Sequence, residues 1–76
     1  MKPRRTDEEA MMAVAKRLKQ IRENKGLSQE SVFIDTDYNI GRIEVGKTNL
    51  SISTISILCK YYGITLEEFF KGIETK

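Results

Sequence analysis

Residues 22–47, RENKGLSQESVFIDTDYNIGRIEVGK, decide the fold. Gly26 follows a basic helical pattern and is suited to end it, because glycine readily adopts the left-handed conformation that closes a helix. Ser28 can then cap a short second helix, which we expect to end near residue 35 or 36. The apolar residues of this helix expected to face the interior are Val32 and Phe33. The stretch therefore predicts two helices separated by a tight connection.

The segment 37–46 predicts a third helix of barely two turns. Asp37 is expected to cap its start and Gly46 to end it. Gly41 weakens this pattern, since a glycine inside a helix costs about 1 kcal/mol relative to alanine. The next three residues, Lys-Thr-Asn at 47–49, are then expected to form an exposed loop.

Upstream of Gly26, the pattern predicts a long first helix over residues 7–25. Thr6 and Glu9 have the spacing of a capping box, in which each side chain satisfies a backbone amide at the helix start. Apolar residues then recur every three or four positions, which is typical of a helix with one buried face. That face comprises Met11, Val14, Ala15, Leu18 and Ile21, with Arg22 beside it.

Downstream, two further helices are expected. Ser51 and Gly63 bracket the fourth, whose β-branched residues would also suit a strand, but whose spacing of three and four favours a helix. Its apolar stripe is Ile52, Ile55, Leu58, Cys59 and Tyr62. Thr65 and Glu68 form a second capping box, which opens a fifth helix that ends before Gly72. The apolar residues of this last helix are Leu66, Phe69 and Phe70.

These elements predict one all-α domain over residues 1–76, a compact five-helix bundle. A chain of 76 residues is near the lower end of what a single core can stabilise. With one cysteine, Cys59, and no histidine, it lacks an internal disulfide, the usual metal ligands and the usual general base. We therefore predict that the protein is not an enzyme and has no catalytic residue, no metal and no cofactor.

The distribution of charge is more informative than the net charge of +2. Basic residues crowd the first third, namely Lys2, Arg4, Arg5, Lys16, Arg17, Lys19, Arg22 and Lys25, whereas Glu67, Glu68 and Glu74 gather near the end. This asymmetry favours a polyanionic partner, although solvated helix faces would also explain it. No signal peptide and no apolar run of about 18 residues is evident. The expectation is a soluble cytoplasmic protein with neither a membrane partner nor a small-molecule ligand.

The segments KGLSQE at 25–30 and RIEVGK at 42–47, followed by GITLEEFF at 63–70, carry a specific resemblance. Over residues 15–70 the chain resembles the helix-turn-helix family of lambdoid phage repressors, Cro proteins and their bacterial relatives, with a basic arm at 1–5. The resemblance implies a λ-repressor-like fold and a sequence-specific transcriptional regulator of double-stranded DNA. In this family the second and third helices bind DNA, and the third lies in the major groove.

The resemblance also assigns roles to individual residues. Gln29 matches a glutamine that binds phosphate and supports the recognition helix, and Ser28 would share that phosphate. Arg22 and Glu44 match a pair that joins the first and third helices and orients the arginine toward the DNA backbone; a purely structural ion pair is the alternative. The loop residues expected to contact phosphates, or else to be ordinary solvated positions, are Lys47, Thr48 and Asn49.

Base recognition is expected from Asn39 and Arg42, three residues apart on the face opposite the apolar side of the third helix. Arginine can bond a guanine edge at two points, and asparagine can do so with adenine. Gly41 would permit a close approach of the backbone to DNA or to a neighbouring helix; a tight local bend is the competing explanation.

The chain departs from the family in one region. Relatives usually have about three more residues between the positions of Gln29 and Glu44, which is nearly one helical turn. The recognition helix is therefore shortened, and Phe33 stands where relatives commonly have a small residue, so that its ring is expected to fill the vacated space. A protein-interaction module or antitoxin-like regulator on the same fold stays open as an alternative function. A homodimer is also expected, with a surface drawn from Tyr61, Phe69, Phe70 and Ile73.

Overall fold

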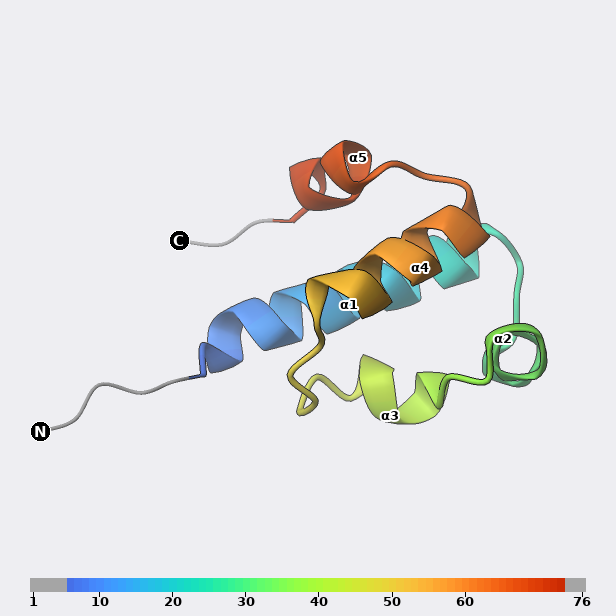
Figure 1. Cartoon of the computed structure of the whole chain (residues 1–76), viewed down its shortest axis with the longest axis horizontal. Helices are drawn as coiled ribbons and strands as arrows, with labels where there is room; N and C mark the ends of the chain where they lie inside the picture. Colours follow the sequence, from blue (N-terminus) through green and yellow to red (C-terminus); the bar gives the residue numbers. More distant parts are fainter. Residues whose placement is uncertain (1–5, 74–76) are drawn as a thin grey trace, which may run out of the picture.

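The computed structural model describes residues 6–73 and consists of five helices joined by short connections (Figure 1). They are α1 (Glu8–Asn24), α2 (Gln29–Thr36), α3 (Ile40–Glu44), α4 (Ile52–Tyr62) and α5 (Leu66–Lys71). No strand occurs within residues 6–73. The all-α, five-helix prediction is therefore confirmed, while the basic arm at 1–5 and Glu74 lie outside the described residues.

The other three helices lie on two sides of a central pair, α1 and α4 (Figure 1). In Figure 1, α4 lies in front of α1, with α5 on one side of this pair and α2 and α3 on the other. α3 contacts both α1 and α2, and α5 contacts α4. Within residues 6–73 no helix is both long enough and apolar enough to cross a bilayer. The arrangement leaves the outer side of α3 turned away from α5.

One apolar cluster joins all five helices. It comprises Leu18, Ile21, Val32, Ile40, Ile43, Ile55, Leu58, Cys59, Tyr62 and Phe69. The predicted stripes of the first and fourth helices are largely confirmed, because most of their members are in this cluster or pack against it. Cys59 is a buried free thiol, as expected of a small core residue, and burial raises its pKa.

Two residues expected in the core are exposed instead. The Phe33 side chain is 47% exposed, because α2 buries only one face and Val32 already occupies it. Ile52 is 59% exposed since it is the first residue of α4. Side chains in a helix tilt toward its N-terminus, so the first residue projects beyond the packed turn.

The helix starts confirm most of the predicted caps. Ser28, Ser51 and Thr65 each accept a hydrogen bond from the backbone amide three residues later, and Thr65 completes the capping box with Glu68. The box predicted at Thr6 is wrong: Asp7 caps α1 and accepts from the amide of Ala10 at 3.0 Å. A carboxylate is favoured there over a hydroxyl because the helix N-terminus carries a partial positive charge.

Asp37 does not begin the third helix as predicted. It ends α2 in the left-handed conformation, with φ of 63°, and Asn39 caps α3 by accepting from the amide of Arg42. Aspartate and asparagine tolerate the left-handed region better than most residues, so the two polar residues can divide the tasks of ending one helix and starting the next. As a result α3 contains only five residues.

Arg17 holds α5 against α1, a role that no local pattern predicted. Its Nε donates to the carbonyl of Phe69 and its Nη2 to the carbonyl of Glu68, both at 3.1 Å. A cation is favoured at these carbonyls because the C-terminal end of a helix carries a partial negative charge. Arg17 therefore has a structural role, because its guanidinium joins α1 to α5.

Gly46 sets how closely the end of α3 approaches α1. Its φ is +86°, and a Cβ atom built there would overlap the sulfur of Met12 and lie 3.4 Å from the Cβ of Ala15. We expect Gly46→Ala to lower the free energy of unfolding by about 1–3 kcal/mol, since it combines backbone strain with overpacking. Urea denaturation followed by circular dichroism measures this loss.

Gly63→Ala is the matched control, because Gly63 also has a positive φ, of 79°, but a Cβ atom added there would have no neighbouring atom within 4 Å. Gly63→Ala should lower the free energy of unfolding only by the cost of backbone strain. Equal destabilisation by both substitutions would contradict the close approach of α3 and α1.

Candidate nucleic-acid interface

The turn between α2 and α3 is held by local hydrogen bonds. The hydroxyl of Thr36 donates to the carbonyl of Val32 at 2.7 Å and accepts from the amide of Tyr38 at 3.2 Å. Together with the left-handed Asp37, these bonds turn the chain from α2 into α3 over three residues. The two helices therefore form a compact unit, joined by a tight turn.

A buried ion pair attaches this unit to α1. The Nε of Arg22 donates to Oε2 of Glu44 at 2.7 Å, and its Nη2 donates to Oε1 at 2.9 Å. The side chains are only 9% and 3% exposed. The Nη1 of Arg22 also donates to the carbonyl of Leu27 at 2.8 Å, so one guanidinium joins α1, α3 and the connection before α2.

The environment keeps Arg22 protonated. The hydrogen bonds from Arg22 to Glu44 are the largest cause that raises the pKa of Arg22, and they outweigh the opposing effect of burial. Tyr62 lies in the same region, where burial and, secondly, the charge of Glu44 raise its pKa to about 12. Tyr62 therefore stays neutral over the pH range in which proteins normally fold.

Gln29 connects the start of α2 to the end of α3. Its Nε2 donates to Oε1 of Glu44 at 3.0 Å. A Cβ atom at Gly41 would lie 3.2 Å from Oε1 of Gln29, which is tighter than ordinary contact. Gly41 has no positive φ. Of the two explanations for this glycine, the structure therefore favours close approach of a neighbouring helix over a local bend.

The remaining candidate residues lie at the surface around α3. Ser28, Asn39, Arg42, Lys47 and Asn49 are exposed, whereas Thr48 is partly buried. Asn39 uses its Oδ1 for the cap of α3, which leaves its amide nitrogen available. Within residues 6–73, Arg42 forms no side-chain ion pair or hydrogen bond. Its guanidinium is thus available for a partner.

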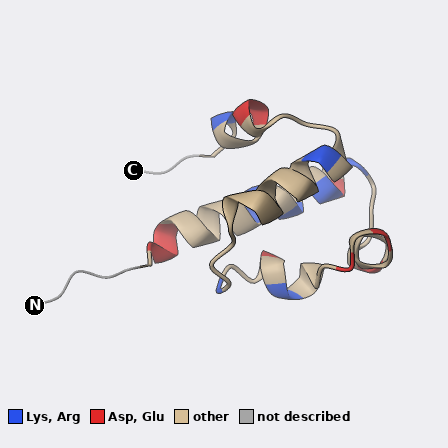
Figure 2. Cartoon of the chain, in the orientation of Figure 1, with Lys and Arg blue, Asp and Glu red and all other residues tan. Residues whose placement is uncertain are grey.

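The charges of this surface are unevenly divided (Figure 2). Basic residues lie on α3 and in the loop that follows it, while α2 and its end carry Glu30, Asp35 and Asp37. The basic first helix contributes less than its composition indicated, because Arg17 and Arg22 are used inside the fold. The positive surface near α3 therefore rests on Arg42 and Lys47.

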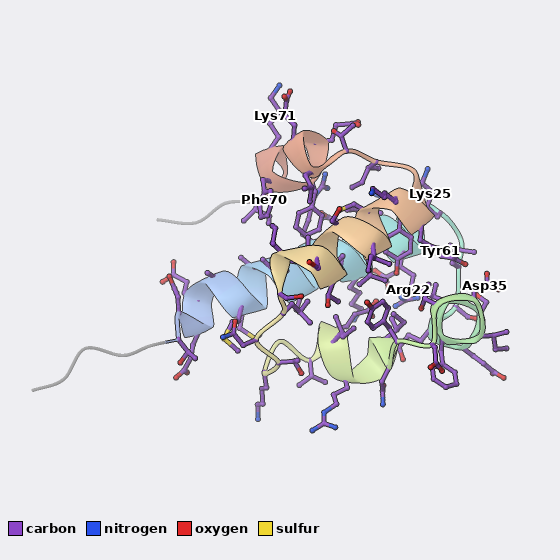
Figure 3. The ribbon with its side chains drawn as sticks, in the orientation of Figure 1. Arg22, Lys25, Asp35, Tyr61, Phe70 and Lys71 are labelled. Carbon is purple, nitrogen blue, oxygen red and sulfur yellow. The ribbon has the colours of Figure 1, made fainter. Side chains whose placement is uncertain are left out.

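One further link behind this surface could not be found from the sequence. The hydroxyl of Tyr61 on α4 donates to Oδ2 of Asp35 on α2 at 2.5 Å, and this bond raises the pKa of Tyr61 (Figure 3). The two residues are 26 positions apart, so no local spacing signals the contact. It joins the end of α2 to α4 at the surface of the bundle.

Two short helices joined by a tight turn, supported from behind by α1 and exposing polar residues on the outer helix, define a helix-turn-helix domain. Residues 39–69 match the profile of the helix-turn-helix family. Residues 39–69 thus belong to this family, and the five-helix architecture around them is λ-repressor-like. No solved structure gave a significant match to the chain.

Curated relatives are named as regulators of this type. The HTH-type transcriptional regulator PuuR of Escherichia coli is 42% identical over 66 residues, which cover 83% of this chain and 36% of the relative. The HTH-type transcriptional regulator DdrOP3 of Deinococcus deserti is 31% identical over 67 residues, which cover 83% of this chain and 51% of the relative. The chain thus spans about a third to a half of the length of these two relatives.

The buried ion pair makes a strong prediction about stability. Arg22→Met or Glu44→Leu alone should cost about 3–5 kcal/mol, because each leaves the partner's charge buried without compensation. The double variant should cost less than the sum of the two single losses. Urea denaturation of all four proteins measures the coupling.

Glu30→Gln serves as the control, since Glu30 is exposed on α2 and should change stability by no more than about 0.5 kcal/mol. Strictly additive losses for Arg22 and Glu44 would show that the pair is not energetically coupled.

Proposed function

We propose that this chain binds double-stranded DNA as a sequence-specific transcriptional regulator, with α3 in the major groove. The observation that carries the proposal is the position of Arg42, which is exposed and forms no side-chain bond within residues 6–73. It lies on a helix anchored from behind by the Arg22–Glu44 pair. Such a helix holds the backbone of Arg42 at a defined position, from which its guanidinium could bond a guanine edge at two points. The names of PuuR and DdrOP3 support the same function.

The other candidate residues fit complementary roles in this proposal. Gln29 and Ser28 at the start of α2 would bind one phosphate, because the first amides of a helix attract anions. The loop residues Lys47, Thr48 and Asn49 would bind another. Asn39 would offer its amide nitrogen to a base edge. Gly41 lets α2 and α3 pack closely, and Arg22, being buried, acts as a positioning residue that does not itself contact DNA.

The short α3 limits how many bases it can contact. Five residues span less than two helical turns, so phosphate contacts and the deformability of the DNA would supply a larger share of the affinity. The proposed role is binding without catalysis, and it would place the protein in the cytoplasm with the DNA. Binding of a protein partner by the same surface is the alternative, favoured by the acidic residues of α2.

Fluorescence anisotropy with a pool of random duplexes, followed by selection of the tightest sequences, tests the proposal. Affinity should fall steeply between about 50 and 200 mM salt, because phosphate contacts release bound counterions. Arg42→Ala should weaken binding to the selected duplex by about 1–3 kcal/mol and relax its specificity at one position. Lys47→Ala should weaken binding to all sequences about equally.

Lys16→Ala is the control, because Lys16 is an exposed cation that lies beside Gly72 and Ile73 and away from α3. It should leave selectivity unchanged. Failure of the folded wild-type protein to bind DNA at low salt would overturn the proposal and direct the search to protein partners.

A homodimer is the assembly that we propose for DNA binding, with a second copy covering the outward face of α4 and α5. This face is defined by Ile57, Leu66 and Phe70; Ile57 and Leu66 line one groove, and Phe70 is one turn after Leu66 on α5. Phe69, which was expected at the dimer surface, is instead fully buried in the core. Because α5 and α3 lie on opposite sides of the α1–α4 pair, this face is free when α3 contacts DNA (Figure 1).

Sedimentation equilibrium tests this assembly. The wild-type protein should show the mass of two chains, and Phe70→Glu should convert it to one chain, since a charge in an apolar interface is costly. Ile34→Glu is the control, because Ile34 is 70% exposed on α2, outside the proposed interface. A wild-type protein of single-chain mass at every concentration measured contradicts the dimer.

A further inference from the structure

Phe33 is a large aromatic residue that is not part of the buried core. Its ring is about half exposed, while its neighbour Val32 fills the core position of α2. Phe33 lies one helical turn after Gln29 and lines a surface groove between α2 and the start of α3. The other residues that line this groove are Gln29, Glu30, Asn39, Ile40 and Gly41.

This groove lies on the surface that the proposed function turns toward DNA. Asn39 and Gln29, the candidates for base and phosphate contacts, border it from both sides. The expectation that the ring fills space vacated by the missing turn is only half met: the ring lies beside the start of α3 but stays exposed. An apolar group is thus placed next to the polar residues of the interface.

The chemistry of the groove indicates which part of DNA it would meet. A phosphate would be disfavoured beside Phe33, because the ring donates no hydrogen bond and Glu30 adds a negative charge to the same groove. Base edges in the major groove include one apolar group, the 5-methyl of thymine, which proteins contact with apolar side chains. Phe33 matches that group in its apolar character.

We propose that Phe33 is a specificity-determining residue that contacts the 5-methyl group of a thymine in the major groove. The proposal rests on the proposed function and assigns part of the base recognition to α2. The five-residue α3 leaves room for this contact, because no additional turn stands between α2 and the bases. α2 and α3 would then recognise neighbouring base pairs together.

Deoxyuridine substitution tests the contact directly, because uracil differs from thymine only by the missing methyl group. Starting from a duplex selected by the wild-type protein, each thymine is replaced in turn and the dissociation constant is measured by fluorescence anisotropy. We expect about a fourfold loss of affinity at one position, the effect of one methyl group buried from water. In Phe33→Ala, the loss at that position should disappear.

Ile34→Ala is the matched control, because Ile34 is the adjacent exposed apolar residue and does not line the groove. It should retain the fourfold loss. If Phe33→Ala does not keep its helical circular dichroism, Phe33→Leu replaces it and should reduce the loss.

Three results would overturn the inference. Wild-type protein that discriminates sequences but tolerates uracil at every position has no thymine-methyl contact. A loss that persists unchanged in the folded Phe33 variant places the contact on another residue. Absence of any sequence-selective binding by the wild-type protein is a distinct result, because it removes the proposed function itself and the inference with it.

Discussion

The buried Arg22–Glu44 ion pair is the interaction on which the candidate interface depends. A helix of five residues has few internal hydrogen bonds and would not persist alone. Ile40 and Ile43 bury its inner side, but apolar packing is not directional and leaves the helix free to rotate or slide. The two bonds from the guanidinium of Arg22 to Glu44 are directional, and they therefore define where α3 ends and which side it turns outward.

This use of charge inside the fold changes how the composition should be interpreted. Arg22 is neutralised by Glu44, and Arg17 is bonded to the carbonyls at the end of α5, so two cations of the basic first helix serve the architecture. Arg42 and Lys47 lie near α3 without such a partner in the described part of the chain. A net charge of +2 conceals this division, because it counts structural and surface cations alike. The location of each charge, rather than the total, therefore indicates that the side of the molecule bearing α3 is the one suited to face DNA.

Much of the fold could be predicted because it is encoded locally. Apolar spacing located the first and fourth helices, and caps and glycines located the other three. Ser28, Ser51 and Thr65 marked three of the starts, since capping involves residues only three positions apart. Errors arose where neighbours compete: Asp7 displaced Thr6, and Asn39 took the cap expected from Asp37. Phe33 was misplaced because spacing cannot tell which of two adjacent apolar residues of a short helix is buried. The bonds of Arg17 to α5 and of Tyr61 to Asp35 join distant positions, and no local pattern reports them.

The shortness of α3 makes α2 and α3 one functional surface. Gln29 bonds to Glu44, Gly41 lets the two helices approach, and Asp35 bonds to Tyr61 of α4, so α2 cannot shift without disturbing the support of α3. A phosphate bound at the start of α2 would therefore fix the position of Arg42 through the same carboxylate that Arg22 holds. In a longer recognition helix, the helix itself could supply that precision over several turns. Here that precision must come from the contacts between helices. These same contacts place Phe33 in the surface groove between α2 and the start of α3.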